Sequence, residues 1–176
     1  MSLSTVTDCN CRISEDFDIL RRMEVFSSAP AEVIKLFAYF AKHRVYQPGE
    51  MILQQGYKAD SCFFLIRGKV EVTAMHKGQH VVLQHLADNA FFGELALLAR
   101  FEWFFSVKAL EETELIITDR ESFQKILEKY PDRRERITEK IVQLRISRFE
   151  HQTAYLLDKL IDSGVNTEIG SQPFII

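Results

Sequence analysis

The order of apolar and polar positions divides the chain into a helical beginning, a middle of short strands and a helical end. Residues 1–14 are polar and show no period, so we expect a disordered tail there. From Glu15 to Phe26 apolar side chains recur at helical spacing. A second helix is predicted from about Ala31 to Ala41, after Pro30, which suits a first helical turn. Residues 15–42 are therefore expected to be helical.

After His43 the period changes to two, which is typical of strands. We expect strands at Val45–Gln47, Met51–Gln54, Cys62–Arg67, Lys69–Met75, Val81–Ala87 and Glu114–Thr118. Turns are expected at Gln47–Glu50, which contains Pro-Gly, and at His76–Gln79, which reads as a hairpin. Many short strands joined by glycine-bearing turns predict an antiparallel barrel or jelly roll over residues 43–118.

Residues 119–163 return to the helical period. One helix is expected to run to Lys129, begun either by a Thr118/Glu121 capping box or by Asp119 as the cap. Pro131 breaks that helix, and a long one follows to about residue 163, where Gly164 is a natural stop. Residues 164–176 are then a tail, too short for an attached output domain.

The long helix carries apolar residues at alternating spacings of four and three. They are Val142, Ile146, Phe149, Thr153, Leu156 and Leu160. This is a seven-residue seam, and at about 1.5 Å per residue the helix spans on the order of 45 Å. Two interpretations remain open: a homodimer through this helix, which we favour, or a helix that packs on its own barrel.

Composition limits the classes of function. The 47% apolar and 27% charged residues fit a globular protein, and 22 basic against 25 acidic side chains give a net charge of −3, without the basic excess of a DNA-binding protein. No apolar run is long enough for a membrane span, and the first residues lack the pattern of a secretory signal. We therefore expect a cytoplasmic protein with no direct DNA binding and no membrane association.

Metal and catalytic motifs are not indicated. Cys9 and Cys11 form a C-x-C without a second cysteine pair, so free thiols are favoured over half of a metal site. His76, His80 and His85 do not form the H-x-H on one strand that would place two ligands on one face. We expect no metal, no cofactor and no enzyme activity.

The stretch Phe91–Ala109, FFGELALLARFEWFFSVKA, has the features of an anion site. Gly93 permits close approach of a ligand to the backbone, and the N–H groups of a short following helix would point at negative charge. Glu94 can accept hydrogen bonds from a sugar hydroxyl.

This stretch resembles the phosphate-binding cassette of the cyclic nucleotide-binding domain family, which includes the catabolite activator protein and the protein kinase A regulatory subunit. The family pattern is F-G-E-L-A-L, then R-[AST]-A about seven residues later, and Phe92–Leu97 match its first half. The turn glycines at 49, 56, 68, 78 and 93 extend the resemblance over about residues 25–163. The resemblance implies a mainly β fold: a double-stranded β-helix (jelly-roll) barrel, with N-terminal helices and a long C-terminal helix, over residues 15–163.

The resemblance also implies a small-molecule sensor of cAMP or cGMP, and from the short tail we expect it to lack an output domain. The expected ligand-binding residues within the cassette, 91–103, and beyond it are Phe92, Gly93, Glu94, Leu95, Ala96, Arg100, Trp103, Phe104 and Arg148. In the family the backbone N–H groups at Gly93–Ala96 meet the phosphate, and Glu94 takes the ribose hydroxyl. By counting from Pro131, Arg148 and Phe149 stand where the family closes its long helix over the base; the alternative is a solvated arginine beside a seam phenylalanine.

The second half of the pattern departs from the family. Trp103 occupies the slot of the phosphate-pairing arginine, and Phe104 and Phe105 occupy the small-residue slots. Loss of a charge-assisted hydrogen bond of roughly 1.5–3 kcal/mol weakens binding about 10- to 150-fold. Three interpretations follow: a cyclic nucleotide paired by Arg100, a flatter ligand stacked on the rings, or a pocket filled by its own side chains in a ligand-free dimerisation module. Trp103 and Phe105 are expected on one face, and Phe104 on the other.

Overall fold

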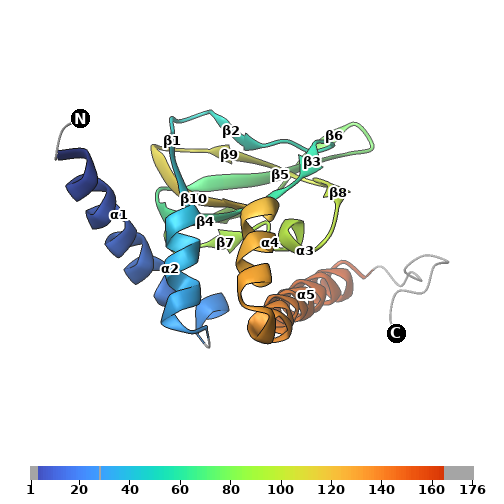
Figure 1. The fold of residues 1–176 in the computed structure, drawn as a ribbon. Coiled ribbons are helices and arrows are strands. Elements are labelled where there is room, and N and C mark those ends of the chain that lie inside the picture. Colours follow the sequence, from blue (N-terminus) through green and yellow to red (C-terminus); the bar gives the residue numbers. More distant parts are fainter. Residues whose placement is uncertain (1–3, 28, 165–176) are drawn as a thin grey trace. The chain divides into compact units, whose positions relative to one another are not determined.

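The computed structural model describes residues 4–27 and 29–164 (Figure 1). They fall into two compact units, Met1–Ile141 and a second that begins at Val142. The helices are α1 (Ser4–Arg21), α2 (Ala31–Phe40), α3 (Leu95–Leu98), α4 (Arg120–Lys129) and α5 (Arg134–Asp162), with 3-10 turns η1 (Glu24–Phe26) and η2 (Pro131–Arg133). The strands are β1 (Lys42–Tyr46), β2 (Met51–Leu53), β3 (Lys58–Ala59), β4 (Ser61–Arg67), β5 (Val70–His76), β6 (Gln79–Leu86), β7 (Phe91–Phe92), β8 (Phe101–Glu102), β9 (Ser106–Ala109) and β10 (Thr113–Asp119).

The strands form two antiparallel four-stranded sheets and a small ribbon. One sheet has the order β1-β10-β4-β7, the other β2-β9-β5-β6, and β3 pairs with β8. The expected closed barrel is wrong, because the sheets of the described chain remain open. A barrel needs its edge strands to pair, and β7, at one edge, has only two residues. The fold is a mixture of strands and helices in a jelly-roll arrangement.

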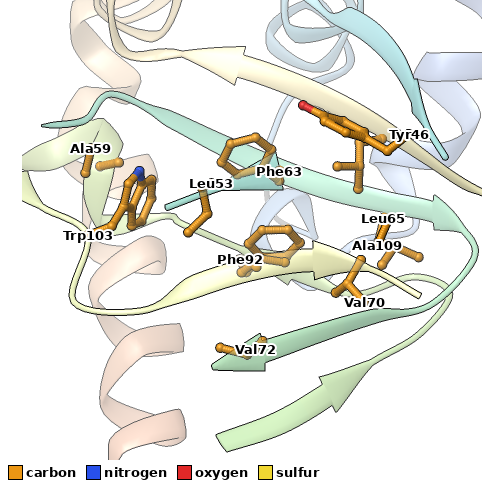
Figure 2. Packing of buried hydrophobic residues seen from close by; sticks show 13 residues of the cluster. Tyr46, Leu53, Ala59, Phe63, Leu65, Val70, Val72, Phe92, Trp103 and Ala109 are labelled. Atoms are coloured by element: carbon orange, nitrogen blue, oxygen red, sulfur yellow. The ribbon is translucent and has the colours of Figure 1, made fainter. Parts of the chain in front are cut away.

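The core lies between the two sheets. Tyr46, Phe63 and Leu115 come from the first sheet, and Leu53 and Val107 from the second, yet all belong to one buried cluster (Figure 2). In β10 the neighbouring residues Leu115 and Ile116 are both buried, so this strand is covered on both of its faces. Sheet-on-sheet packing thus buries this cluster, and a further set of buried apolar residues lies on α2 and α4.

The turn predictions are confirmed. His76 pairs with Gln79, and Lys77 and Gly78 both have positive φ, 49° and 77°, as a two-residue hairpin turn requires. Gly49, at the Pro-Gly turn, has φ of 89°. Its N–H donates to the Ala109 carbonyl at 2.8 Å, which ties the turn to β9.

The N-terminal helices cover one side of the first unit. α2 packs on α4 through Phe37 and Phe123, whose ring centroids are 5.9 Å apart. α1 begins at Ser4, so the expectation of a disordered tail over residues 1–14 is corrected for the described part, whereas residues 1–3 lie outside it. Adding residues to an existing helix costs less than starting one, and the fully buried Leu20 anchors the C-terminal end of α1.

The C-terminal helices begin and end close to the predicted residues. Asp119 caps α4, because its Oδ1 accepts from the Ser122 N–H at 2.8 Å, and this decides between the two predicted caps. Gly164 has φ of 66°, as expected of a helix stop. No helix among the described residues combines the length and the apolar character needed to cross a membrane.

Helix α5 contributes to both units. Ile137 and Ile141 are buried in the first unit. In the second unit, the seam residues Val142, Ile146, Phe149 and Leu156 are 41–58% exposed. The homodimer through this seam stays a prediction.

Candidate functional site

The cassette sits at the end of β7, where the chain leaves the first sheet. Gly93 has φ of 79°, a conformation that favours glycine. The Ala96 N–H then donates to the Gly93 carbonyl and the Leu97 N–H to the Glu94 carbonyl, at 2.9 and 3.1 Å, which closes the first turn of α3. The short helix predicted from the sequence is therefore present, and it begins directly after Glu94.

Glu94 is buried, with 3% of its surface exposed. It lies near Cys62, a buried free thiol of β4. Burial raises the pKa of Cys62 well above its ordinary range, and the negative charge of Glu94 raises it further. The thiol therefore stays neutral, and Glu94 is enclosed with Phe92, Gly93 and Ala96, which are also buried.

Trp103 lies against Gly93 of the cassette. It is 5% exposed, and its Cη2 lies 3.0 Å from the point where a Cβ on Gly93 would stand. The indole also packs against Phe63 and Phe101, with ring centroids 6.4 and 5.5 Å away. Figure 2 shows it beside Ala59, within the same core cluster as Phe63 and Phe92. The residue in the arginine slot thus adds an apolar ring to the core rather than a charge to the site.

Backbone hydrogen bonds fix the direction of Trp103. Its N–H donates to the Tyr57 carbonyl at 2.8 Å, and its carbonyl accepts from the Gly56 N–H at 2.7 Å. These bonds continue the β3–β8 ribbon by one residue. Because both backbone groups are held by the segment before β3, the side chain is directed into the core.

The predicted facing of the three aromatic residues is confirmed, although they lie in a bend between β8 and β9 rather than in a strand. Phe105 packs against Trp103 at a centroid distance of 5.7 Å, whereas Phe104 is 55% exposed. The rings therefore form a chain from the buried indole to the surface. Arg100 is exposed, and its pairing with a phosphate stays a prediction.

Arg120 was missed by the sequence analysis. Its Nε donates to the Ala96 carbonyl at 2.5 Å, and its Nη2 donates to the Ala59 carbonyl at 2.7 Å and to the Ala99 carbonyl. A signal was present, because a cation in the first turn of a helix opposes the macrodipole and needs a partner elsewhere.

Two further expectations concern other parts of the chain. Arg148 is half-buried on the part of α5 that belongs to the second unit, and its closure over a base stays a prediction. In the described residues no group of three His, Cys, Asp or Glu side chains is placed to hold a metal ion.

The chain is similar to known proteins over most of its length. Residues 43–130 match the family profile described as "Cyclic nucleotide-binding domain". The human potassium/sodium hyperpolarization-activated cyclic nucleotide-gated channel 2 is 29% identical over 163 residues. That match covers 91% of this chain but only 17% of the channel, so the chain spans a small part of this relative.

Solved structures give the same picture. A cyclic nucleotide-binding-like protein from Brucella abortus has a TM-score of 0.59 and 28% identity, covering 65% of this chain and 98% of that one. The catabolite activator protein of Thermus thermophilus has a TM-score of 0.64 and 26% identity, and the match covers 78% of this chain and 62% of that one. The regulatory domain of Toxoplasma gondii protein kinase A with cAMP, at 19% identity and a TM-score of 0.68, covers 80% and 51% and supports the fold.

Proposed function

The chain belongs to the cyclic nucleotide-binding domain family, and from this premise we propose that it is a regulatory domain whose cassette is occupied by its own Trp103 instead of a free nucleotide. One observation carries the proposal: the indole is 5% exposed and its Cη2 lies 3.0 Å from the Cβ position of Gly93. A cyclic phosphate bound at Gly93–Ala96 and this indole would compete for the same space.

Magnitudes favour the indole. A tryptophan side chain buries roughly 150–250 Å², so exposing it costs about 4–6 kcal/mol at about 25 cal/mol per Å². The missing arginine removes roughly another 1.5–3 kcal/mol. A ligand held by a complete cassette at micromolar Kd gains about 8.2 kcal/mol, and a millimolar one about 4.1 kcal/mol. The combined losses take a micromolar ligand below millimolar affinity.

A second function is favoured by a different observation. Gly93 has a positive φ, Glu94 is buried and the α3 turn follows them, all within the half of the stretch that matches the family pattern. Under this alternative the domain senses cAMP or cGMP, and Trp103 leaves the cassette when the ligand enters. The two functions differ in the affinity that they predict for cAMP and cGMP, and this affinity can be measured.

Calorimetric titration with cAMP and cGMP separates the two. We expect no saturable heat for the wild type up to millimolar nucleotide. The triple variant Trp103→Arg/Phe104→Ser/Phe105→Ala restores the family pattern and is expected to bind, and adding Glu94→Gln to it should weaken binding about 10- to 150-fold. Wild-type binding tighter than millimolar would make the sensor the correct function.

The regulatory output is proposed to be association through α5. The exposed seam residues of the second unit recur every seven residues, as in helices that pair with a second copy. Sedimentation equilibrium should show a dimer that Leu156→Asp dissociates. Leu157→Asp, at an exposed position beside the seam, is the matched control and should leave the dimer intact. A monomeric wild type at high concentration contradicts this part of the proposal.

A further inference from the structure

The guanidinium of Arg120 joins two backbone segments that are distant in sequence and ties both to its own helix, α4. It donates to Ala96 and Ala99 at the C-terminal end of α3, and to Ala59 at the end of β3. Arg120 is itself the first residue of α4. Its backbone N–H donates to the Asp60 carbonyl at 2.7 Å, so both its backbone and its side chain hold the segment between β3 and β4.

The bonds to α3 replace those that the short helix cannot make. A helix leaves its last carbonyls without intrahelical partners. α3 ends after Leu98, because Ala99 has extended angles, φ −134° and ψ 155°. The Ala96 carbonyl would accept from residue 100 if the helix continued. Arg120 supplies that donor instead, and places a positive charge at the C-terminal end, where the macrodipole favours it.

The planar fork of arginine is needed for this arrangement. Two of its nitrogens reach acceptors on two different segments, in fixed directions. A lysine ammonium has no rigid fork and sits as a point charge on a flexible stem. Rotation or displacement of α3 therefore stretches bonds that end on the first residue of α4.

We propose that Arg120 is the positioning residue that fixes α3 and transmits a change in cassette occupancy to α4. The inference rests on the proposed function in one respect: it takes Trp103 as the group that occupies the cassette. α3 is four residues long, and only two of them, Ala96 and Leu97, are buried. The carbonyl contacts make α3 and the N-terminal turn of α4 move together, so a smaller side chain at position 103 loosens both.

Native-state hydrogen exchange tests the coupling without any nucleotide. The perturbation at the cassette is Trp103→Leu, and the readouts are the amides of Leu97 in α3 and Ser122 in α4. With Arg120 present, Trp103→Leu should lower the protection of both amides. With Arg120→Met, Leu97 should still respond but Ser122 should not, a loss of coupling of about 5- to 150-fold. The Leu115 amide in β10 serves as the reference for global unfolding.

Two further variants keep the test decisive. Lys125→Met removes a cation of the same helix that donates a hydrogen bond to Glu121, also on α4, and it should leave the Ser122 response unchanged. Arg120→Lys keeps the charge, serves if Arg120→Met does not fold, and should also lose the coupling. The proposal is overturned if Trp103→Leu lowers the protection of the Ser122 amide as much in the Arg120→Met background as in the wild type. It is also overturned if the full coupling persists in Arg120→Lys. Because no nucleotide is used, this result is independent of the titration that tests the proposed function.

Discussion

Gly93→Ala tests directly whether the indole rests against the cassette backbone. An added Cβ would stand 3.0 Å from the Ser61 carbonyl, 3.0 Å from Cη2 of Trp103 and 3.3 Å from Cδ2 of Phe63. The left-handed conformation costs a residue with a Cβ about 1–2 kcal/mol, and overpacking adds about 1–3 kcal/mol. The single substitution should therefore lower the free energy of unfolding by roughly 2–5 kcal/mol.

The contact with Trp103 can be isolated by a double-mutant cycle. Trp103→Phe removes Cη2 but keeps a six-membered ring in the core. The strain at φ 79° and the contact with the Ser61 carbonyl remain in this background. Gly93→Ala should therefore be less destabilising by about 0.5–3 kcal/mol in Trp103→Phe than in the wild type, which is the usual range for residues in contact.

Urea unfolding followed by far-ultraviolet circular dichroism measures all four proteins without depending on tryptophan emission. Gly68→Ala is the control. Its added Cβ would stand 2.7–2.8 Å from atoms of Glu112 and Thr113, and both residues lie outside the cassette. Its cost should add to that of Trp103→Phe within about 0.5 kcal/mol. If Gly93→Ala is equally additive, the indole does not fill the cassette as described.

The remaining predictions concern ion pairs, a helix cap and the exposure of the indole. His43 Nε2 lies 2.7 Å from Oδ1 of buried Asp16, so His43→Ala should lower the free energy of unfolding by about 1.5–3 kcal/mol, and adding Asp16→Ala should recover part of that loss in urea unfolding. Burial raises the pKa of Asp119, but the hydrogen bonds from Lys42 and Ser122 outweigh it, and the net pKa is lowered. Its contribution is therefore present above the unfolded value of about 3.9 and is lost as pH falls through the folded pKa, so Asp119→Ala should cost about 0.5–2 kcal/mol at pH 7 and progressively less in acid. Trp103 is the single tryptophan, so acrylamide should quench its emission weakly in the wild type and more strongly in Arg120→Met. Equal quenching in both proteins contradicts the role given to Arg120.

The local elements were predictable because short-range rules determine them. Glycine is the residue expected where a turn needs a positive φ, and Gly49, Gly78 and Gly93 all have a positive φ in the structure. Asp119 was one of two caps that the sequence allowed, and α4 ends at Lys129 as its pattern predicts. The departure at Trp103 was also visible, because a missing arginine is a property of the sequence.

The long-range features were not predictable from periodicity. Whether Trp103 faces the core depends on its bonds with Gly56 and Tyr57, 46–47 positions earlier, and no local pattern encodes that ribbon. Arg120 finds acceptors 21, 24 and 61 residues away. The prediction of a closed barrel was wrong for a related reason. Whether sheet edges pair depends on β7 and its neighbours in space, and the sequence pattern of a single strand does not contain that information.

An occupant that never leaves carries no signal by itself, since a regulatory domain responds only when the balance between two states changes. If Trp103 fills the cassette permanently, the input must reach the domain elsewhere. Coupling between two sites is reciprocal in free energy. A partner that shifts the first turn of α4 must therefore also change, through Arg120 and the carbonyls of α3, how firmly the indole is held. In the family pattern the cassette binds a ligand. In this chain the indole-filled cassette would instead be the state whose stability a partner changes when it shifts α4.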